Sequence, residues 1–155
     1  MSVLLAVDVG LRTGLAVFGA DGRLISYRSQ NLGTPARLRR AAFGVLAALP
    51  RLRWLILEGG GQLADIWKRA AERRGVTVVQ IGAERWRERL LYDRERRSGE
   101  EAKAHAGELA RRVIDWSAAP RPTSLRHDAA EAILIGVWGA LEVGLLGSVP
   151  DGLRT

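Results

Sequence analysis

The chain has 155 residues, of which 47% are hydrophobic and 26% charged, a composition that predicts one globular domain with a sizeable core. It contains no cysteine and two histidines, which excludes disulfide frameworks, thiolate zinc sites and histidine-rich metal centres. The net charge of +7 comes almost wholly from arginine, whose guanidinium group matches phosphate oxygens and favours a polyanionic partner. A coding bias toward arginine on a solvated surface explains the same composition.

Three consecutive strands are predicted at the N-terminus, over residues 3–9, 13–19 and 23–30. The first contains a charged residue, Asp8, in an otherwise apolar run. Burying an isolated carboxylate costs several kcal/mol unless a cation or a partner compensates its charge. Asp8 is therefore either an ion-pair partner of Arg12 or a ligand of a metal ion held on the sheet.

Helices and strands alternate in the following part of the chain. Thr34 as N-cap and Pro35 at the first helical position predict a helix that runs to about Leu49. Residues 54–58 and 76–81 are short apolar runs typical of buried parallel strands, with a helix between them over 62–74. Further helices are predicted around 84–91, over 99–116 and over 124–146. Right-handed strand–helix–strand crossovers then give one α/β domain over 1–155, a mixed sheet with the first strand central and helices on both faces.

The last predicted helix is apolar on most sides. Residues 132–149 are nearly long enough to span a bilayer, but Glu142 and several glycines argue against a membrane span. Such a helix is more often packed on a sheet and against a partner subunit. The N-terminal apolar run has no basic leader, so a secretory signal is not expected and the protein is assigned to the cytoplasm.

Four carboxylates are expected to converge from three separate elements. Glu58 ends the fourth strand, at the edge where ligands gather in open α/β sheets. Asp128 and Glu131 are three residues apart and share one face of the last helix. Clustered acids repel one another unless cations neutralise them. Two divalent ions roughly 3.5–4 Å apart would do so, and suit in-line displacement at a phosphodiester. An all-carboxylate site favours Mg²⁺, with Mn²⁺ as a substitute.

Each acid also has a simpler explanation when it is taken alone. Asp8 can be a structural ion-pair partner and Glu58 a surface charge at a strand end. Asp128 and Glu131 can be helix charges favoured by the macrodipole. One shared site explains all four positions together better than these separate explanations do.

Three segments together resemble a known family. They are Asp8-Val9-Gly10-Leu11-Arg12-Thr13-Gly14-Leu15-Ala16, Leu57-Glu58 and His127-Asp128-Ala129-Ala130-Glu131-Ala132. The set resembles the RuvC-type Holliday junction resolvases of the ribonuclease H-like superfamily, most of all their phage and organellar members. The resemblance covers most of the chain and implies a ribonuclease H-like fold with a five-stranded sheet of order 3-2-1-4-5.

The same resemblance implies a function and roles for particular residues. Asp8, Glu58, Asp128 and Glu131 would be catalytic and would bind two Mg²⁺ ions. The implied activity is paired nicking of four-way DNA junctions by a homodimer, in a bacterial or phage-infected cell in preference to an organelle. Lys103 matches a basic position of the family that can contact the scissile phosphate, although a solvated helix lysine is an equally simple explanation.

Other residues are assigned from their neighbourhood. His127 adjoins the acidic pair and either supports a metal-binding acid or faces the DNA, or is a simple solvated histidine. No base-reading element is visible, so recognition through shape and the phosphate backbone is expected. The loop after Glu58 is glycine-rich and lacks an evident junction-opening aromatic, for which Leu63 and Trp67 are the alternatives. The predicted DNA contacts are all arginines: Arg12, Arg37, Arg39, Arg40, Arg94, Arg96 and Arg97.

Three alternative functions remain open. A YqgF-like nuclease acting on RNA shares the opening motif, but typically lacks an Asp-x-x-Glu pair on a long apolar helix. An actin-like ATPase fragment also carries Asp-x-Gly before a hairpin, but its nucleotide cleft needs two such domains. A non-catalytic nucleic-acid-binding relative is disfavoured because all four acids are present.

Overall fold

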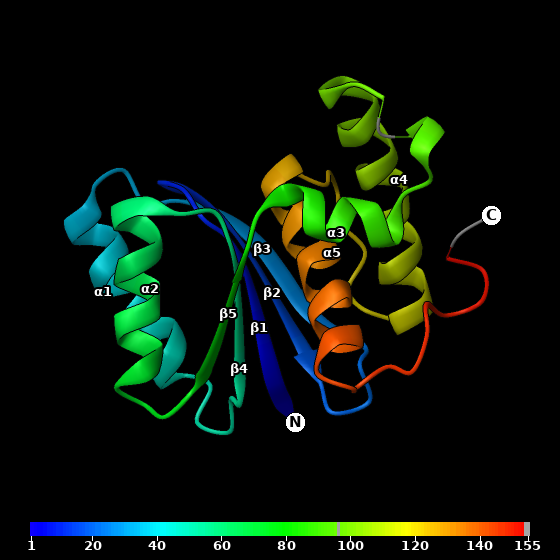
Figure 1. Ribbon diagram of the computed structural model, residues 1–155. Coiled ribbons are helices and arrows are strands. Elements are labelled where there is room, and N and C mark those ends of the chain that lie inside the picture. The colour runs from blue at the N-terminus through cyan, green and yellow to red at the C-terminus, as the bar shows by residue number, and fades with distance from the viewer. Residues whose placement is uncertain (96, 154–155) are drawn as a thin grey trace.

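The structure is a computed structural model that describes residues 1–95 and 97–153. A mixed sheet of five strands in the order β3-β2-β1-β4-β5 lies between two layers of helices (Figure 1). Strands β1, β2 and β3 are antiparallel neighbours, and β1, β4 and β5 are parallel. The predicted fold class and strand order are confirmed. The strands are β1 (Ser2–Asp8), β2 (Arg12–Gly19), β3 (Leu24–Asn31), β4 (Trp54–Glu58) and β5 (Thr77–Ile81).

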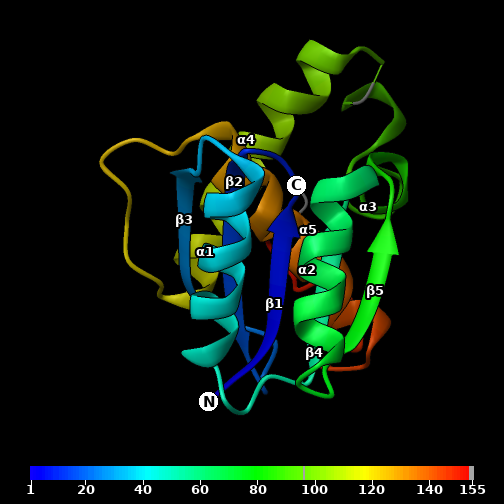
Figure 2. The same cartoon turned by 90° about the vertical axis from the view of Figure 1, so that its left-hand side faces the viewer.

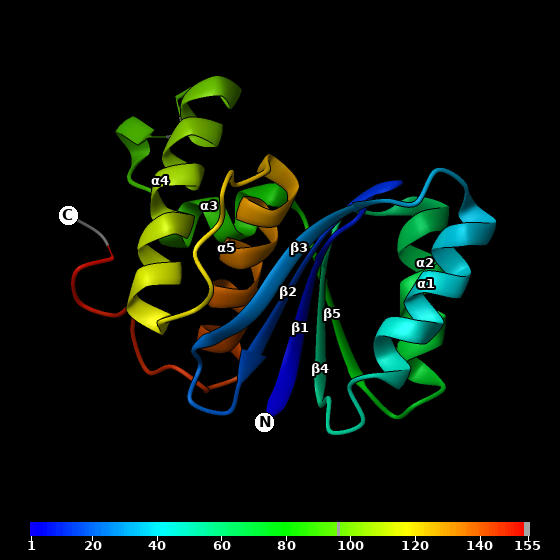
Figure 3. The ribbon, with the colours of Figure 1, turned by 180° about the vertical axis from the view of Figure 1, so that it is seen from behind.

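The helices divide between the two faces of the sheet. On one face, α1 (Pro35–Ala47) and α2 (Gly61–Glu72) lie side by side (Figure 2). The other face is covered by α3 (Ala83–Leu90), α4 (Gly99–Ser117) and α5 (His127–Glu142), as the view from behind also shows (Figure 3). A single 3₁₀ turn, η1 (Asp93–Glu95), precedes α4. The predicted start of α1 is confirmed, since the Thr34 hydroxyl accepts a hydrogen bond from the backbone N–H of Arg37.

Helix α5 occupies the centre of its layer. Every residue from Ala129 to Leu141 is buried. A Cβ added at Gly136 would lie 1.9 Å from the Phe18 ring, and one at Gly139 would lie 2.6 Å from Ile56. The two glycines therefore let the helix backbone lie directly on the sheet, where larger residues would hold it away.

The bounds of α5 differ from the predicted 124–146. The helix begins at His127 because an irregular segment with Pro120 and Pro122 precedes it, and it ends at Glu142. Gly144, at φ +86°, turns the chain away from the helix. None of the described helices combines the length and apolarity needed to cross a bilayer. The apolar sides of α5 are covered within this chain, so its composition alone gives no reason for a partner subunit.

The second core lies between the sheet and the α1–α2 layer. Leu38, Ala42 and Leu46 of α1 and Trp67 of α2 are buried there together with the strand residues. Trp67 is fully buried, so it cannot be the junction-opening aromatic considered from the sequence. Trp86, on the other side of the sheet, is also fully buried.

Candidate metal centre

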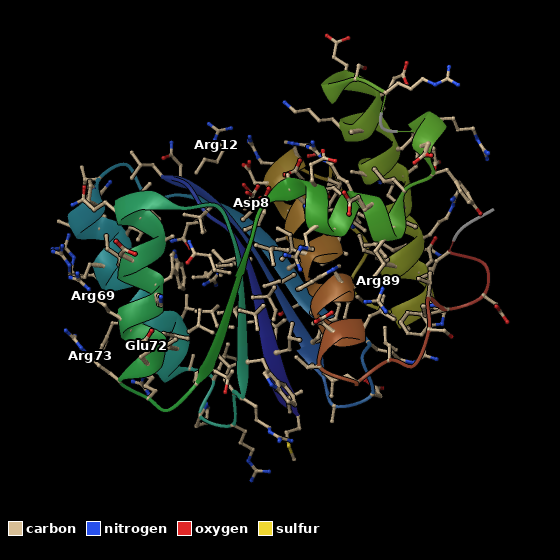
Figure 4. All side chains as sticks on the ribbon, in the orientation of Figure 1. Asp8, Arg12, Arg69, Glu72, Arg73 and Arg89 are labelled. Atoms are coloured by element: carbon tan, nitrogen blue, oxygen red, sulfur yellow. The ribbon has the colours of Figure 1, made fainter. Side chains whose placement is uncertain are left out.

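Two of the predicted acids face each other at the carboxyl ends of neighbouring strands. Asp8 is the last residue of β1 and Glu58 the last of β4, and the two are paired in register across the parallel strands. Both are half-buried. Asp8 lies at the upper end of the sheet, between the two helical layers (Figure 4). The expected position of the site, at the carboxyl edge of the parallel strands, is where the structure puts these side chains.

The third acid comes from the buried helix α5. One carboxylate oxygen from each of Asp8, Glu58 and Glu131 lies within 4.8 Å of the others. Gly14 on β2 makes this approach possible, because a Cβ at that position would lie 1.9 Å from the carbonyl oxygen of Asp128. Three elements distant in sequence therefore bring three carboxylates to one point.

Asp128 lies at the margin of this cluster. Its Oδ2 accepts a hydrogen bond of 3.2 Å from the Ser29 hydroxyl on β3. Its negative charge nevertheless acts on Asp8, whose pKa it raises. Asp128 is not one of the three residues whose oxygens meet, and its role as a metal ligand stays a prediction.

Burial and crowding perturb the ionisation of the cluster. The pKa of Asp8 is raised from 3.8 to about 9, first by burial, then by a hydrogen bond with Glu58 and by the charges of Glu58, Glu131 and Asp128. Burial also raises the pKa of Glu131, and the charge of Glu58 raises it further. Without a cation, the Asp8 carboxyl therefore keeps its proton at neutral pH.

Three basic side chains oppose the charge of Glu131. His127 Nε2 lies 2.8 Å from Glu131 Oε1, one helical turn away, and Arg87 Nη2 lies 3.7 Å from the same oxygen. His127, Arg87 and Lys103 all lower the pKa of Glu131, in that order of size. His127 therefore contacts a predicted ligand directly, and the electrostatic effect of Lys103 reaches the site from α4.

The residues present suit a hard divalent cation. The three converging donors are carboxylates, the ligand type that Mg²⁺ and Mn²⁺ prefer. A divalent ion would also remove the repulsion that raises the pKa of Asp8. The donor set and its unfavourable charge thus fit the cofactor expected from the sequence.

The predicted DNA-binding arginines fall into three groups. Arg12 is exposed at the start of β2, and Figure 4 shows it close to Asp8 at the same end of the sheet. Arg94 stacks over the Tyr92 ring at 4.6 Å, and Arg97 is exposed just before α4. Arg96 lies outside the described residues. The other group, on α1, is across the sheet from α5: Arg37, Arg39 and Arg40.

Sequence reasoning missed Arg87, Ser29 and the role of Gly14. Arg87 lies in the helix predicted around 84–91 and was not among the predicted site residues, yet its Nε is buried with no partner among the described residues. Its position between the buried Trp86 and Leu90 at the edge of the apolar face of α3 is a sequence signal that marks it. Ser29 and Gly14 carry no such signal, because their contacts depend on where α5 docks.

No protein-family model matches the sequence, and no curated protein matches it. Solved structures are similar to it over nearly the whole chain. RuvC of T. thermophilus in complex with a Holliday junction substrate matches with a TM-score of 0.67 and 19% identity, covering 97% of this chain and 99% of that one. The chain has the fold of RuvC.

Two further structures agree with this assignment. Another structure of Thermus thermophilus RuvC gives a TM-score of 0.68 at 19% identity, over 96% of this chain and 98% of that one. The yeast mitochondrial Holliday junction resolvase Ydc2 gives 0.52 at 12% identity, over 93% and 82%. The ribonuclease H-like fold expected from the motifs is confirmed, whereas a special closeness to phage and organellar members stays a prediction.

Proposed function

We propose that the protein is a Mg²⁺-dependent endonuclease that resolves four-way DNA junctions by paired nicks. The observation that supports this most is the cluster of Asp8, Glu58 and Glu131 at the carboxyl edge of a sheet with the RuvC fold. The T. thermophilus protein with that fold is bound to a Holliday junction substrate. The site and the structural likeness support phosphodiester hydrolysis more directly than junction selectivity.

In this proposal, Asp8, Glu58 and Glu131 hold the cations, and Asp128 joins them by turning from Ser29 toward the cluster. Two bound divalent ions would supply activation of the attacking water and stabilisation of the leaving 3′ oxygen. Asp8 must release its proton for the site to load, because a protonated carboxyl is a poor metal ligand.

The basic residues have two tasks in this mechanism. Arg87 and His127 oppose the effect of burial on the pKa of Glu131 and fix the direction of its carboxylate. Lys103, exposed on α4, and Arg12, exposed at the start of β2, would each contact a phosphate of the substrate. Their contacts would orient the strand without reading its sequence.

The deciding experiment compares three labelled substrates, a synthetic four-way DNA junction, a linear DNA duplex and an RNA duplex, with Mg²⁺, with Ca²⁺ and with EDTA. We expect nicking of the junction with Mg²⁺ alone. Equal cutting of the linear duplex would contradict junction selectivity and leave the nuclease proposal standing. Cutting of RNA in preference to both DNAs would favour the YqgF-like alternative.

Paired nicks require two active sites on one junction. We propose a homodimer for this reason, acting in the cytoplasm of a bacterial or phage-infected cell. The mass of the junction-bound protein, measured by light scattering, tests it. One protomer per junction would contradict paired incision.

A further inference from the structure

A groove lined by arginines lies between α1 and α2, on the opposite side of the sheet from α5. Its volume is about 760 Å³, enough to accommodate a ligand of nucleotide size. Figure 4 shows Arg69 and Arg73 pointing outward from α2, on the side of the molecule away from Arg89. The groove is lined by Arg39, Arg40 and Phe43 of α1, Ile66, Arg69 and Ala70 of α2, and Arg73 and Arg74 just beyond it.

The charge of the protein is concentrated at this groove. Residues 35–47 and 61–74 contain seven basic and two acidic residues, a net charge of +5 against +7 for the whole chain. Residues 83–142, which include the three helices on the other face, contain eleven basic and eleven acidic residues and are neutral overall. None of the five groove arginines forms an ion pair with a residue that the structure describes. Most of the attraction for a polyanion is therefore remote from the carboxylate cluster.

An exposed aromatic ring lies among these arginines. Phe43 is 66% exposed, whereas Leu38 and Leu46 of the same helix are buried. The Arg74 guanidinium lies 5.5 Å from the centre of its ring. Arg39 and Arg40 are four and three residues before Phe43, so all three share one side of α1. Arg69 and Arg73 are spaced four apart on the facing side of α2.

We infer that this groove binds a single-stranded segment of nucleic acid. The guanidinium groups would contact successive phosphates, and a base would stack on the free face of Phe43. Basic grooves with an exposed aromatic ring are the recurring solution for single strands. The base faces of a duplex are stacked on one another, so Phe43 would give a duplex no such contact. The proposed reaction uses neither Phe43 nor the arginines of α2, and strand binding is testable without cleavage.

The test measures binding of a fluorescent poly-dT oligonucleotide in EDTA, by anisotropy, at several salt concentrations. Phe43→Ala should weaken binding at least about fivefold, the effect of losing one stacked base. Arg69→Ala/Arg73→Ala should weaken it further and reduce the slope of log K against log salt by about 1.4, the value for two phosphates on a single strand. Arg51→Ala/Arg111→Ala removes the same charge at exposed positions outside the groove, and should leave the affinity within about twofold.

Three results would overturn the inference. They are equal weakening by the control pair, displacement of the oligonucleotide by a poly-glutamate peptide at equal charge concentration, and conversion of a dimer to a monomer by Phe43→Ala. The second would identify an acidic protein segment as the occupant and the third a subunit interface. Because the assay contains no divalent metal, loss of junction cutting has no bearing on it. Poly-dT binding by an inactive enzyme would support the groove and leave the nuclease proposal to its own test.

Discussion

Gly14 and Asp128 touch through their backbones, at the point where α5 meets β2. A Cβ at residue 14 would lie 1.9 Å from the Asp128 carbonyl oxygen, a separation that no pair of non-bonded heavy atoms tolerates. Because residue 14 has no side chain, the helix that contributes Glu131 can approach the sheet this closely. The geometry of the carboxylate cluster follows from this contact.

Gly14→Ala should separate the cluster. We expect it to lower the free energy of unfolding by about 1–3 kcal/mol, the usual cost of overpacking, and to reduce cutting and Mg²⁺ affinity. Gly44→Ala is the matched control, because a Cβ at that exposed helical position would meet nothing within 4 Å beyond its chain neighbours and the adjacent backbone of its own helix. It should stabilise the protein by about 0.5–1 kcal/mol. Urea unfolding and Mg²⁺ titration measure the two effects. Unchanged stability of Gly14→Ala would show that α5 shifts freely.

Asp8→Asn should abolish cutting, with a loss of at least about 100-fold, because it removes a ligand oxygen from the cluster. Binding of the junction should persist, since the proposed phosphate contacts come from basic residues and not from Asp8. Asp65→Asn, an exposed acid on α2, is the control and should cut normally. Gel assays of cutting and binding on the same junction separate the two properties. Undiminished cutting by Asp8→Asn would remove this residue from the mechanism.

Stability without metal should depend on the proton of Asp8. The folded-state pKa of about 9 exceeds the unfolded value of 3.8, so the folded protein holds a proton that the unfolded chain releases. This group therefore stabilises most below pH 3.8, and its contribution falls as pH rises toward about 9. In EDTA, Tm of the wild type should fall relative to Asp8→Asn between about pH 5 and about pH 9. Mg²⁺ should raise the wild-type Tm most at the upper end of that range. Parallel Tm curves for the two proteins would contradict the raised pKa.

Arg87→Gln should shift the pH dependence of cutting. The Arg87 charge lowers the pKa of Glu131, so its removal raises that pKa and moves the acid limb of the rate profile to higher pH. At pH values on the acid side of that limb, the cutting rate of Arg87→Gln should fall by about 10-fold or more. Arg87→Lys should retain most of the wild-type rate. A purely structural role would lower the rate equally at all pH values and would not be rescued by lysine.

Much of the fold follows from local patterns in the sequence. Thr34, Pro35 and the apolar run at 54–58 define their elements by cap and periodicity, and right-handed crossovers predict a central first strand. The full strand order came from the family resemblance. The convergence of Asp8, Glu58 and Glu131 was likewise predictable, because strand ends and helix faces are fixed by spacing. The contacts of Arg87 and Ser29 were not, since they depend on the distance at which α5 docks. The arginine groove was not predictable either, because it forms only when α1 and α2, which β4 separates in the sequence, pack side by side.

The buried position of α5 also determines the stage of folding at which the carboxylate cluster forms. Glu131 follows Asp8 by 123 residues, and its helix supplies both a ligand of the cluster and the centre of one core. During synthesis the first strands emerge long before this helix, and pairing across so large a separation is late and slow. The partly synthesised chain therefore contains the two helices of the basic groove, α1 and α2, before the carboxylate cluster is complete. Under the proposed function, hydrolytic capacity would arise only with the final docking step, so a partly folded chain would not cut nucleic acid.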